Sequence, residues 1–205
     1  MANLKRTRED ILESVIDTVH RKGLSATGLS ELFKLSGASS GSFYNYFGSK
    51  HELGHALIDY EWQKLQQSVI KPAIENCSDP IDRVFWMLDR LEAKQQIEPM
   101  CMGCLLGNLI VDLVEQDESF REHLAVVFDA WQAAIANSLR EAQRELLPNV
   151  EPDILAEEIL TTIEGAMLMG KLRRNGDYIK RGFDSARRLV KASLRSPSAL
   201  TSAHH

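Results

Sequence analysis

The stretch Ser39–Lys50 constrains the chain most, because it combines an apolar helical stripe with an unusually polar outer surface. Phe43 and Phe47 are four residues apart and therefore share one face of a helix. The remaining positions carry hydroxyls, an amide and two phenols. A helix that only packs rarely has so many hydrogen-bonding groups on its other faces, whereas base edges in a DNA major groove offer partners for them. The stretch predicts a groove-reading helix.

Apolar periodicity predicts helices along the rest of the chain, and no segment alternates as a strand does. Thr7 and Asp10 form a capping-box pattern at the start of the first helix, and Gly23 follows the end of that helix. Thr27 is expected to cap the second helix, and Pro72 to end the fourth. The expected helices are 7–22, 27–36, 39–47, 49–71, 80–97, 102–115, 117–147, 152–174 and 177–195.

Two short helices joined by a glycine turn and supported by a first helix describe a helix-turn-helix. We therefore predict an all-α chain with a three-helix DNA-binding domain over residues 1–50. A larger helical ligand-binding and dimerisation domain is expected over 51–195, followed by a tail over 196–205.

The charge distribution is compatible with DNA binding by the N-terminal segment alone. The 205 residues carry a net charge of -5, but residues 1–60 hold 7 Lys+Arg and 7 Asp+Glu, so the acidity lies elsewhere. Three cysteines in a chain of this size argue against a disulfide scaffold. The sequence shows no secretory signal and no apolar run long enough for a bilayer, so we expect a cytoplasmic protein with no cofactor, no metal and no membrane partner.

The N-terminal motifs resemble the TetR family of transcriptional regulators. The similarity is carried by Thr7–Leu12, Lys22–Thr27 and Ser39–Leu53, with the pattern S-x-G-S-F-Y-N-Y-F-x-S-K-x-x-L. The resemblance implies a homodimer that binds a palindromic double-stranded DNA operator, a small-molecule effector enclosed by the middle helices, and a dimer bundle formed by the last two. Most such proteins are repressors and not enzymes. The run Gly103-Cys104-Leu105 resembles a branch of the family with a sensing thiol.

The resemblance also implies which residues contact DNA. Thr27 would cap the second helix against a phosphate, and Lys50 would meet a phosphate at the start of the fourth. Lys5, Arg6 and Arg8 could form a basic arm. The full predicted set is Thr27, Ser39, Ser40, Gly41, Ser42, Tyr44, Asn45, Tyr46 and Lys50. The sequence departs from the family at four positions. Ser40 stands where the family often has a basic residue, and Gly48 stands where it often has proline. Phe33 and Leu35 stand where it often has small residues.

A rival motif is His51-Glu52-Leu53-Gly54-His55, which matches the zinc-peptidase pattern H-E-x-x-H. Two histidines four residues apart can bind zinc, with the glutamate as general base. Glu75 is a candidate third ligand. Against a metallopeptidase, Gly48-Ser49 interrupts the helix just before His51, Pro72 separates Glu75 from it, and no strand is expected to hold an extended substrate.

The middle of the chain contains the candidate effector site. Cys101 and Cys104 form a single C-x-x-C pair, which is weak evidence for zinc or for redox chemistry. Cys104 is either a small buried apolar residue or a thiolate that a helix N-terminus favours. The second possibility leaves open another function for the protein, a thiol redox sensor that does not bind DNA. Trp86 and Met100 are further pocket candidates. The predicted ligand-binding set is Trp62, Phe85, Met102, Cys104, Asn108, Phe128 and Trp131.

The penultimate helix has small and apolar residues at helical spacing, which suggests a dimer seam. The seam residues expected are Ile159, Ile163, Gly165, Ala166, Met167 and Gly170. In the last helix Lys180, Arg181, Arg187 and Arg188 are expected to be solvated or paired with acidic residues.

Overall fold

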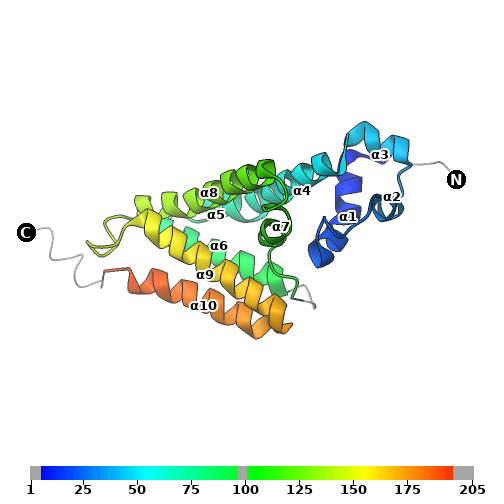
Figure 1. Ribbon diagram of the computed structural model, residues 1–205. Coiled ribbons are helices and arrows are strands. Elements are labelled where there is room, and N and C mark those ends of the chain that lie inside the picture. Colours follow the sequence, from blue (N-terminus) through cyan, green and yellow to red (C-terminus); the bar gives the residue numbers. More distant parts are fainter. Residues whose placement is uncertain (1–5, 97–100, 196–205) are drawn as a thin grey trace, which may run out of the picture. The chain divides into compact units, whose positions relative to one another are not determined.

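Helices make up nearly all the regular structure of the chain. The computed structural model describes residues 6–96 and 101–195 (Figure 1). The elements are α1 (Arg8–Lys22), α2 (Leu29–Ser36), α3 (Ser40–Tyr46), α4 (Lys50–Leu65), the π-helix η1 (Gln66–Ile70), α5 (Lys71–Asn76), α6 (Pro80–Gln96), α7 (Leu105–Leu113), α8 (Glu118–Glu141), α9 (Pro152–Arg173) and α10 (Gly176–Ala192). Within these ranges no strand forms, although an isolated bridge joins Leu146 to Leu194. The all-α prediction is confirmed.

The first helix begins and ends where its sequence signals predict. The Asp10 amide donates to Thr7 Oγ1 at 3.1 Å, and the Thr7 amide donates to Asp10 Oδ2 at 2.8 Å. These reciprocal bonds satisfy two amide groups that have no partner inside the helix. Gly23 follows the last turn at a φ of 87°, a conformation that favours glycine.

The predicted helix end at Pro72 is wrong. Pro72 lies in the first turn of α5, directly after the π-helical turn Gln66–Ile70. Proline lacks the amide hydrogen that an α-helix interior requires, but a position in the first turn of a helix tolerates its absence. The wider turn, in which Lys71 N donates to Gln66 O, lets the helical path restart before the proline.

The eighth helix ends at Glu141, earlier than the expected range of 117–147. The segment after it makes backbone bonds to the end of α10 instead. Leu147 N donates to Ser193 O at 2.9 Å, and Arg195 N donates to Glu145 O at 2.8 Å. These bonds between distant segments replace the local helical ones, and sequence periodicity does not reveal them.

By internal packing the chain divides into two units. The first comprises Met1–Lys64 and Leu105–Val126, and the second comprises Leu65–Cys104 and Val127–His205. This division differs from the predicted domains 1–50, 51–195 and 196–205, which remain a prediction. The tail 196–205 lies outside the described residues.

In the first unit α1 packs against both α2 and α7. Its buried side chains Ile11, Leu12, Val15 and Val19 follow the predicted helical spacing. Phe43 of α3 and Phe47, the residue after its end, are also buried, with ring centroids 5.5 Å apart. The three N-terminal helices therefore form the expected helix-turn-helix around an apolar core.

In the second unit α9 and α10 lie side by side, with α6 also against α10 (Figure 1). The two helices approach closely where small residues face each other. A Cβ atom at Gly182 would collide with the Ala166 methyl group, and one at Gly170 would lie 2.5 Å from Ile179 Cγ1. Among the described residues, no helix is both long enough and apolar enough to cross a membrane.

The contact between Gly182 and Ala166 yields a stability prediction. We expect Gly182→Ala to lower the free energy of unfolding by about 1–2 kcal/mol, because overpacking outweighs the better helix propensity of alanine. The measurement is urea unfolding at one fixed protein concentration. Gly41→Ala is the matched control, since a Cβ there meets nothing within 4 Å and should add up to about 1 kcal/mol. A Gly182→Ala protein as stable as wild type would contradict the close approach.

Candidate DNA-binding surface and sensor site

The third helix divides its residues between an inner and an outer face, as the sequence predicts. Ser39 precedes α3, and its Oγ accepts from Ser42 N at 3.1 Å. Phe43 and Phe47 are 0% and 1% exposed. On the outside Ser39, Ser40, Gly41, Tyr44 and Asn45 are exposed, and Ser42 and Tyr46 are half-buried. A short helix held by two phenylalanines thus presents hydroxyl, amide and phenol groups to solvent.

The orientation of Tyr44 depends on α2. The Phe33 ring lies 5.0 Å from Phe43 and 5.9 Å from Tyr44, both edge to face. Tyr44 is nevertheless 46% exposed. Its ring is therefore packed on one side while the rest reaches solvent. Phe33 is large where the family often has a small residue, and its ring packs against the Tyr44 ring of α3.

The predicted role of Thr27 is wrong. Helix α2 begins after Gly28, and the Thr27 side chain is fully buried. Its hydroxyl donates to Gly23 O at 2.7 Å. A buried hydroxyl that holds the turn between α1 and α2 cannot also meet a DNA phosphate.

Basic groups flank α3 on neighbouring segments. Lys50 Nζ donates to Ser25 O at 3.1 Å, so the start of α4 is tied to the turn before α2. The Arg8 guanidinium lies 5.3 Å from the centre of the Phe47 ring. Arg6 lies near Gly37, with Nη2 3.5 Å from the position of a Cβ there. Lys5, the other predicted member of the arm, lies outside the described residues.

The glutamate of the H-E-x-x-H motif takes part in hydrogen bonds at the start of α4. The Glu52 carboxylate accepts from Gly48 N at 2.9 Å, and Ser49 Oγ accepts from Glu52 N at 3.0 Å. Together these two bonds cap the start of α4. Across residues 6–96 and 101–195, no three His, Cys, Asp or Glu side chains converge on a common metal position. The metallopeptidase alternative has no support here.

The two histidines instead contact residues near the start of α8, which sequence reasoning missed. His51 Nε2 lies 3.1 Å from Asp117 Oδ2, and His55 Nδ1 lies 2.8 Å from His123 Nδ1. Ser119 Oγ lies 3.1 Å from Nε2 of each of the two α4 histidines. The partners are more than 60 residues away in sequence, and no local pattern links them.

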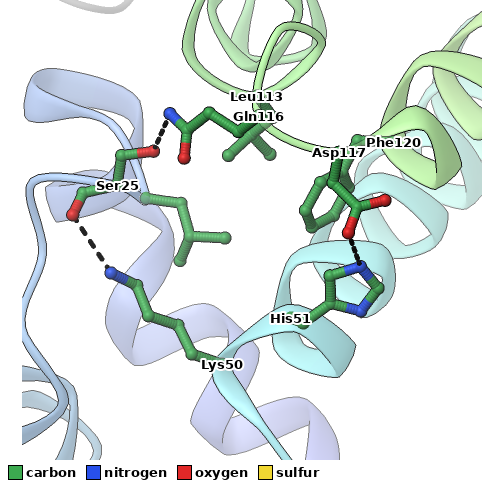
Figure 2. A pocket seen from close by; sticks show the side chains of 8 residues that line it. Ser25, Lys50, His51, Leu113, Gln116, Asp117 and Phe120 are labelled. Carbon is green, nitrogen blue, oxygen red and sulfur yellow. Dashed lines mark hydrogen bonds and ion pairs between the residues drawn. The ribbon is translucent and has the colours of Figure 1, made fainter.

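A pocket of about 260 Å³ opens beside this cluster (Figure 2). Ser25 is held on two sides, by Lys50 at its carbonyl and by Gln116 Nε2 at its Oγ, 2.7 Å away. The residues that line the pocket are Leu24, Ser25, Lys50, His51, Leu113, Gln116, Asp117 and Phe120. The predicted ligand-binding residues do not line this pocket.

The candidate sensor thiol has a carboxyl partner that the sequence did not reveal. Cys104 hydrogen-bonds to Glu164 of α9. Burial raises the pKa of Glu164 to about 7, and the bond from Cys104 opposes that rise only in part. Among the described residues Glu164 Oε1 is buried without a hydrogen-bond partner. Cys77, Cys101 and Cys104 are all free thiols.

The other predicted ligand residues are distributed over both units. Trp131 is 2% exposed, and its ring lies 5.8 Å from that of Phe128. Phe85 packs under Lys191, with Nζ 5.8 Å from the ring centre. Asn108 Nδ2 donates to His20 O at 3.2 Å and so links α7 to α1. Trp62 and Trp86 are half-buried, as is Met102, and Met100 lies outside the described residues. Their role as a ligand site stays a prediction.

The expected dimer seam on α9 lies mostly inside the unit. Ile159, Ile163 and Met167 are buried, and Ala166 and Gly170 face α10. The solvent face carries a different stripe with alternating four- and three-residue spacing, here named the α9 stripe: Ile154, Glu158, Thr161, Gly165, Leu168 and Leu172. Ile154, Leu168 and Leu172 are 50%, 55% and 68% exposed. A groove of about 580 Å³ lies beside it, lined by Ile154, Glu157, Glu158, Thr161, Thr162 and Leu189.

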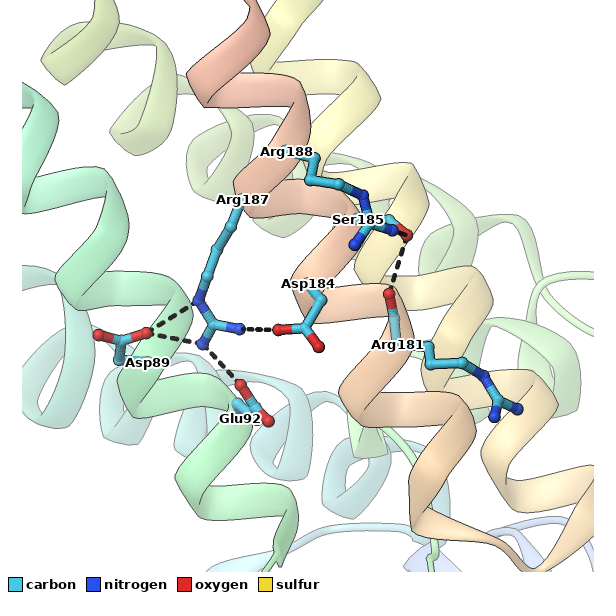
Figure 3. Close-up of polar contacts among 7 residues, drawn as sticks. All are labelled: Asp89, Glu92, Arg181, Asp184, Ser185, Arg187 and Arg188. Carbon is cyan, nitrogen blue, oxygen red and sulfur yellow. Dashed lines mark hydrogen bonds and ion pairs between the residues drawn. The ribbon is translucent and has the colours of Figure 1, made fainter.

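The basic residues of α10 are paired or solvated, as expected (Figure 3). Arg187 Nη2 lies 2.6 Å from both Asp89 and Glu92 of α6, and Nη1 contacts Asp184. Arg188 donates to Ser185 Oγ at 2.7 Å. The Arg181 guanidinium lies over the Tyr178 ring, and Lys180 is exposed. Arg187 thus joins α10 to α6.

Similar proteins agree with this geometry. Residues 11–57 match the family model described as bacterial regulatory proteins, tetR family. Residues 80–186 match the model described as tetracyclin repressor-like, C-terminal domain.

Whole-chain relatives extend the agreement. The transcriptional regulator AcuR of Cereibacter sphaeroides is 30% identical over 82% of this chain and 78% of its own. An uncharacterised HTH-type transcriptional regulator of Lactococcus lactis is 28% identical over 89% of this chain and 92% of its own. A regulatory protein TetR from Rhodobacter sphaeroides has a similar structure, with a TM-score of 0.80 at 28% identity over 91% of this chain and 98% of its own. With a helix-turn-helix and a helical C-terminal part that both match, the chain belongs to the TetR family of DNA-binding transcriptional regulators.

Proposed function

We propose that the chain is a homodimeric repressor that binds a palindromic operator and is released by a small effector. The observation that carries this proposal is the outer face of α3, where polar groups are exposed above two buried phenylalanines. Repressors are among the named relatives, including DhaR of Mycobacterium sp. and NemR of Escherichia coli.

The operator contacts are assigned to α3 and its flanks. Tyr44 and Asn45 offer groups for base edges, and Gly41 leaves room for the duplex to approach. Lys50 and Arg6 would bind phosphate oxygens. The proposed DNA-binding set is Ser39, Ser40, Gly41, Ser42, Tyr44, Asn45, Tyr46 and Lys50. In a dimer the two recognition helices would enter successive major grooves about 34 Å apart.

The DNA prediction uses Asn45→Ala and Gly41→Ala. We expect Asn45→Ala to weaken binding to the DNA upstream of the protein's own gene by about 1–3 kcal/mol, because a base contact is lost. Gly41→Ala should weaken binding without lowering stability, because its Cβ is unopposed in the free protein. The measurement is a fluorescence-anisotropy titration at fixed salt.

Lys180→Ala of α10 is the control, since it removes one exposed cation from a helix with no proposed DNA contact. If Lys180→Ala lost as much affinity as Asn45→Ala, the assignment to α3 would fail.

The dimer is assigned to the α9 stripe and the groove beside it. Three large apolar side chains exposed at helical spacing, with Gly165 open between them, form a surface that a second copy of the same helix can cover about a twofold axis. The second unit buries the other face of α9 against α10, so the stripe remains available to a partner.

The dimer prediction is that Leu168→Glu and Leu172→Glu shift the chain to monomer, because each would bury an unpaired carboxylate at the seam. Sedimentation equilibrium measures the shift. Val111→Glu is the matched control, since Val111 of α7 is an apolar side chain that is even more exposed, at 76%. A dimer that survives both α9 substitutions would place the seam elsewhere.

The effector is assigned to Cys104, with Glu164 as proton acceptor. A carboxyl with a pKa of about 7 is partly ionised at neutral pH and can take the thiol hydrogen to which it is bonded. The thiolate is the nucleophilic form, so the pair favours a thiol-reactive effector. The aromatic pair Trp131 and Phe128 of α8, with Trp131 buried, supports a small apolar effector in the same unit.

Iodoacetamide tests this assignment. Its carbon would bond to Cys104 Sγ, iodide would leave, and the thiol proton would pass to Glu164 and then to solvent. In a Cys77→Ser background we expect fast alkylation of Cys104 with release of DNA, slower alkylation in Glu164→Gln near neutral pH, and no release in Cys104→Ser. Mass spectrometry follows the alkylation and anisotropy the release. Unchanged release in Cys104→Ser would remove the thiol from the mechanism.

A further inference from the structure

Three histidines and two aspartates form a continuous chain within the first unit, between α4 and the start of α8. His123 Nε2 lies 2.9 Å from Asp59 Oδ1, and its Nδ1 lies 2.8 Å from His55 Nδ1. On the other side His55 Nε2 meets Ser119 Oγ at 3.1 Å, and that oxygen donates to Asp117 Oδ1 at 2.7 Å. The DNA-binding function does not use these residues.

The contact between the two facing Nδ1 atoms limits the protons that the pair can hold. At 2.8 Å the two nitrogens share one hydrogen, so one must donate and the other accept. His123 Nε2 donates to Asp59, and His55 Nε2 donates to Ser119 Oγ, because the single hydroxyl hydrogen of Ser119 is directed to Asp117. The intact pair therefore carries three hydrogens on four nitrogens, a net charge of plus one. A further proton would place hydrogens on both facing atoms and break the contact.

The surroundings of His55 resist its protonation. Burial lowers the pKa of His55, the charges of His123 and His51 lower it further, and Asp117 and Asp59 oppose the shift. The Phe120 ring stacks on His55 at 4.4 Å and leaves little water on that face. The titratable and charged groups that face His55 are thus His51 and Asp59 of α4, and Asp117 and His123 on the other side.

The same ring connects the pair to the helix-turn-helix. Phe120 is 4% exposed and lies against Gly54, where a Cβ would approach Phe120 Cζ to 2.7 Å and Leu24 Cδ2 to 2.8 Å. Leu24 is buried in the turn between α1 and α2, next to Ser25, which binds Lys50. All of these residues belong to the first unit. Separation of His55 from His123 would therefore disturb Phe120 and, through it, Leu24 and the start of α4.

We propose that the His55–His123 pair is a proton-operated latch: it holds α4 to α8 while the two rings share one hydrogen, and its second protonation releases this contact and weakens DNA binding. The latch adds acid as an input to the regulator, distinct from the effector proposed at Cys104. Its titration and its effect on stability do not depend on DNA binding.

The sign of the pH effect follows from linkage. A histidine whose folded pKa lies below its unfolded value of about 6.5 binds fewer protons in the folded state. Stability is then complete above the unfolded pKa and is lost as the pH falls from that value toward the folded one. Because the two histidines interact, the pair should titrate in two separate steps.

The experiment follows wild type, His123→Asn and Asp59→Asn by histidine NMR titration and by thermal unfolding, from about pH 8 to about pH 5. In wild type we expect two histidine steps, a falling unfolding midpoint and loss of the NOE between Phe120 and Leu24 in the second step. In His123→Asn the amide keeps a neutral partner at the position of Nδ1, so the acid-induced loss should shrink. Asp59→Asn removes a carboxylate that favours the charged pair, so the loss should grow.

Replacement of His204 and His205 by alanine is the control and should leave the pH profile unchanged. The same acid-induced loss in wild type and His123→Asn, or an intact Phe120–Leu24 NOE in the doubly protonated protein, would overturn the latch. The coupling to DNA predicts that wild type loses about tenfold more operator affinity than His123→Asn between about pH 7.5 and about pH 5.5. Binding at the higher pH tests the proposed function, whereas an equal change in both proteins counts against the coupling.

Discussion

The break between α3 and α4 sets the positions of most candidate site residues in the first unit. Ser49 Oγ accepts from Glu52 N and the Glu52 carboxylate accepts from Gly48 N, and these two bonds cap α4 directly after α3. The cap determines where α3 ends and at which residue the register of α4 begins. That register places His51 and His55 toward the start of α8. The same two bonds use the glutamate that a zinc peptidase would need as its base.

The recognition helix depends on aromatic packing from two sides. Phe43 and Phe47 attach it to the domain, and Phe33 of α2 supports Tyr44 from the edge. Helices this short have little stability of their own in water, so packing supplies what local hydrogen bonds do not. The polar residues of α3 are then free to face solvent. Thr27 shows that a polar residue near the motif need not lie on the outer face. Its hydroxyl is buried and donates to Gly23 O.

Helix α9 shows why periodicity alone does not identify which apolar face of a helix is exposed. Ile159, Ile163 and Met167 have the spacing of a seam, but they are buried. The exposed stripe of Ile154, Leu168 and Leu172 has the same kind of spacing on another face. A helix with two apolar faces does not indicate by its sequence which face its own chain covers. The close approach of Gly182 to Ala166 decides this by drawing α10 onto the first face.

Local signals in the sequence determined the all-α class, the capped start of α1, the helix-turn-helix and the two faces of α3, because these depend on residues a few positions apart. Tertiary structure alone decided the π-turn before Pro72, the early end of α8, the Glu164 partner of Cys104 and the histidine chain from Asp59 to Asp117. Each of these depends on a hydrogen-bond register or on contacts that packing selects. Periodicity specifies which side chains share a face of a helix, whereas the fold determines what lies opposite that face.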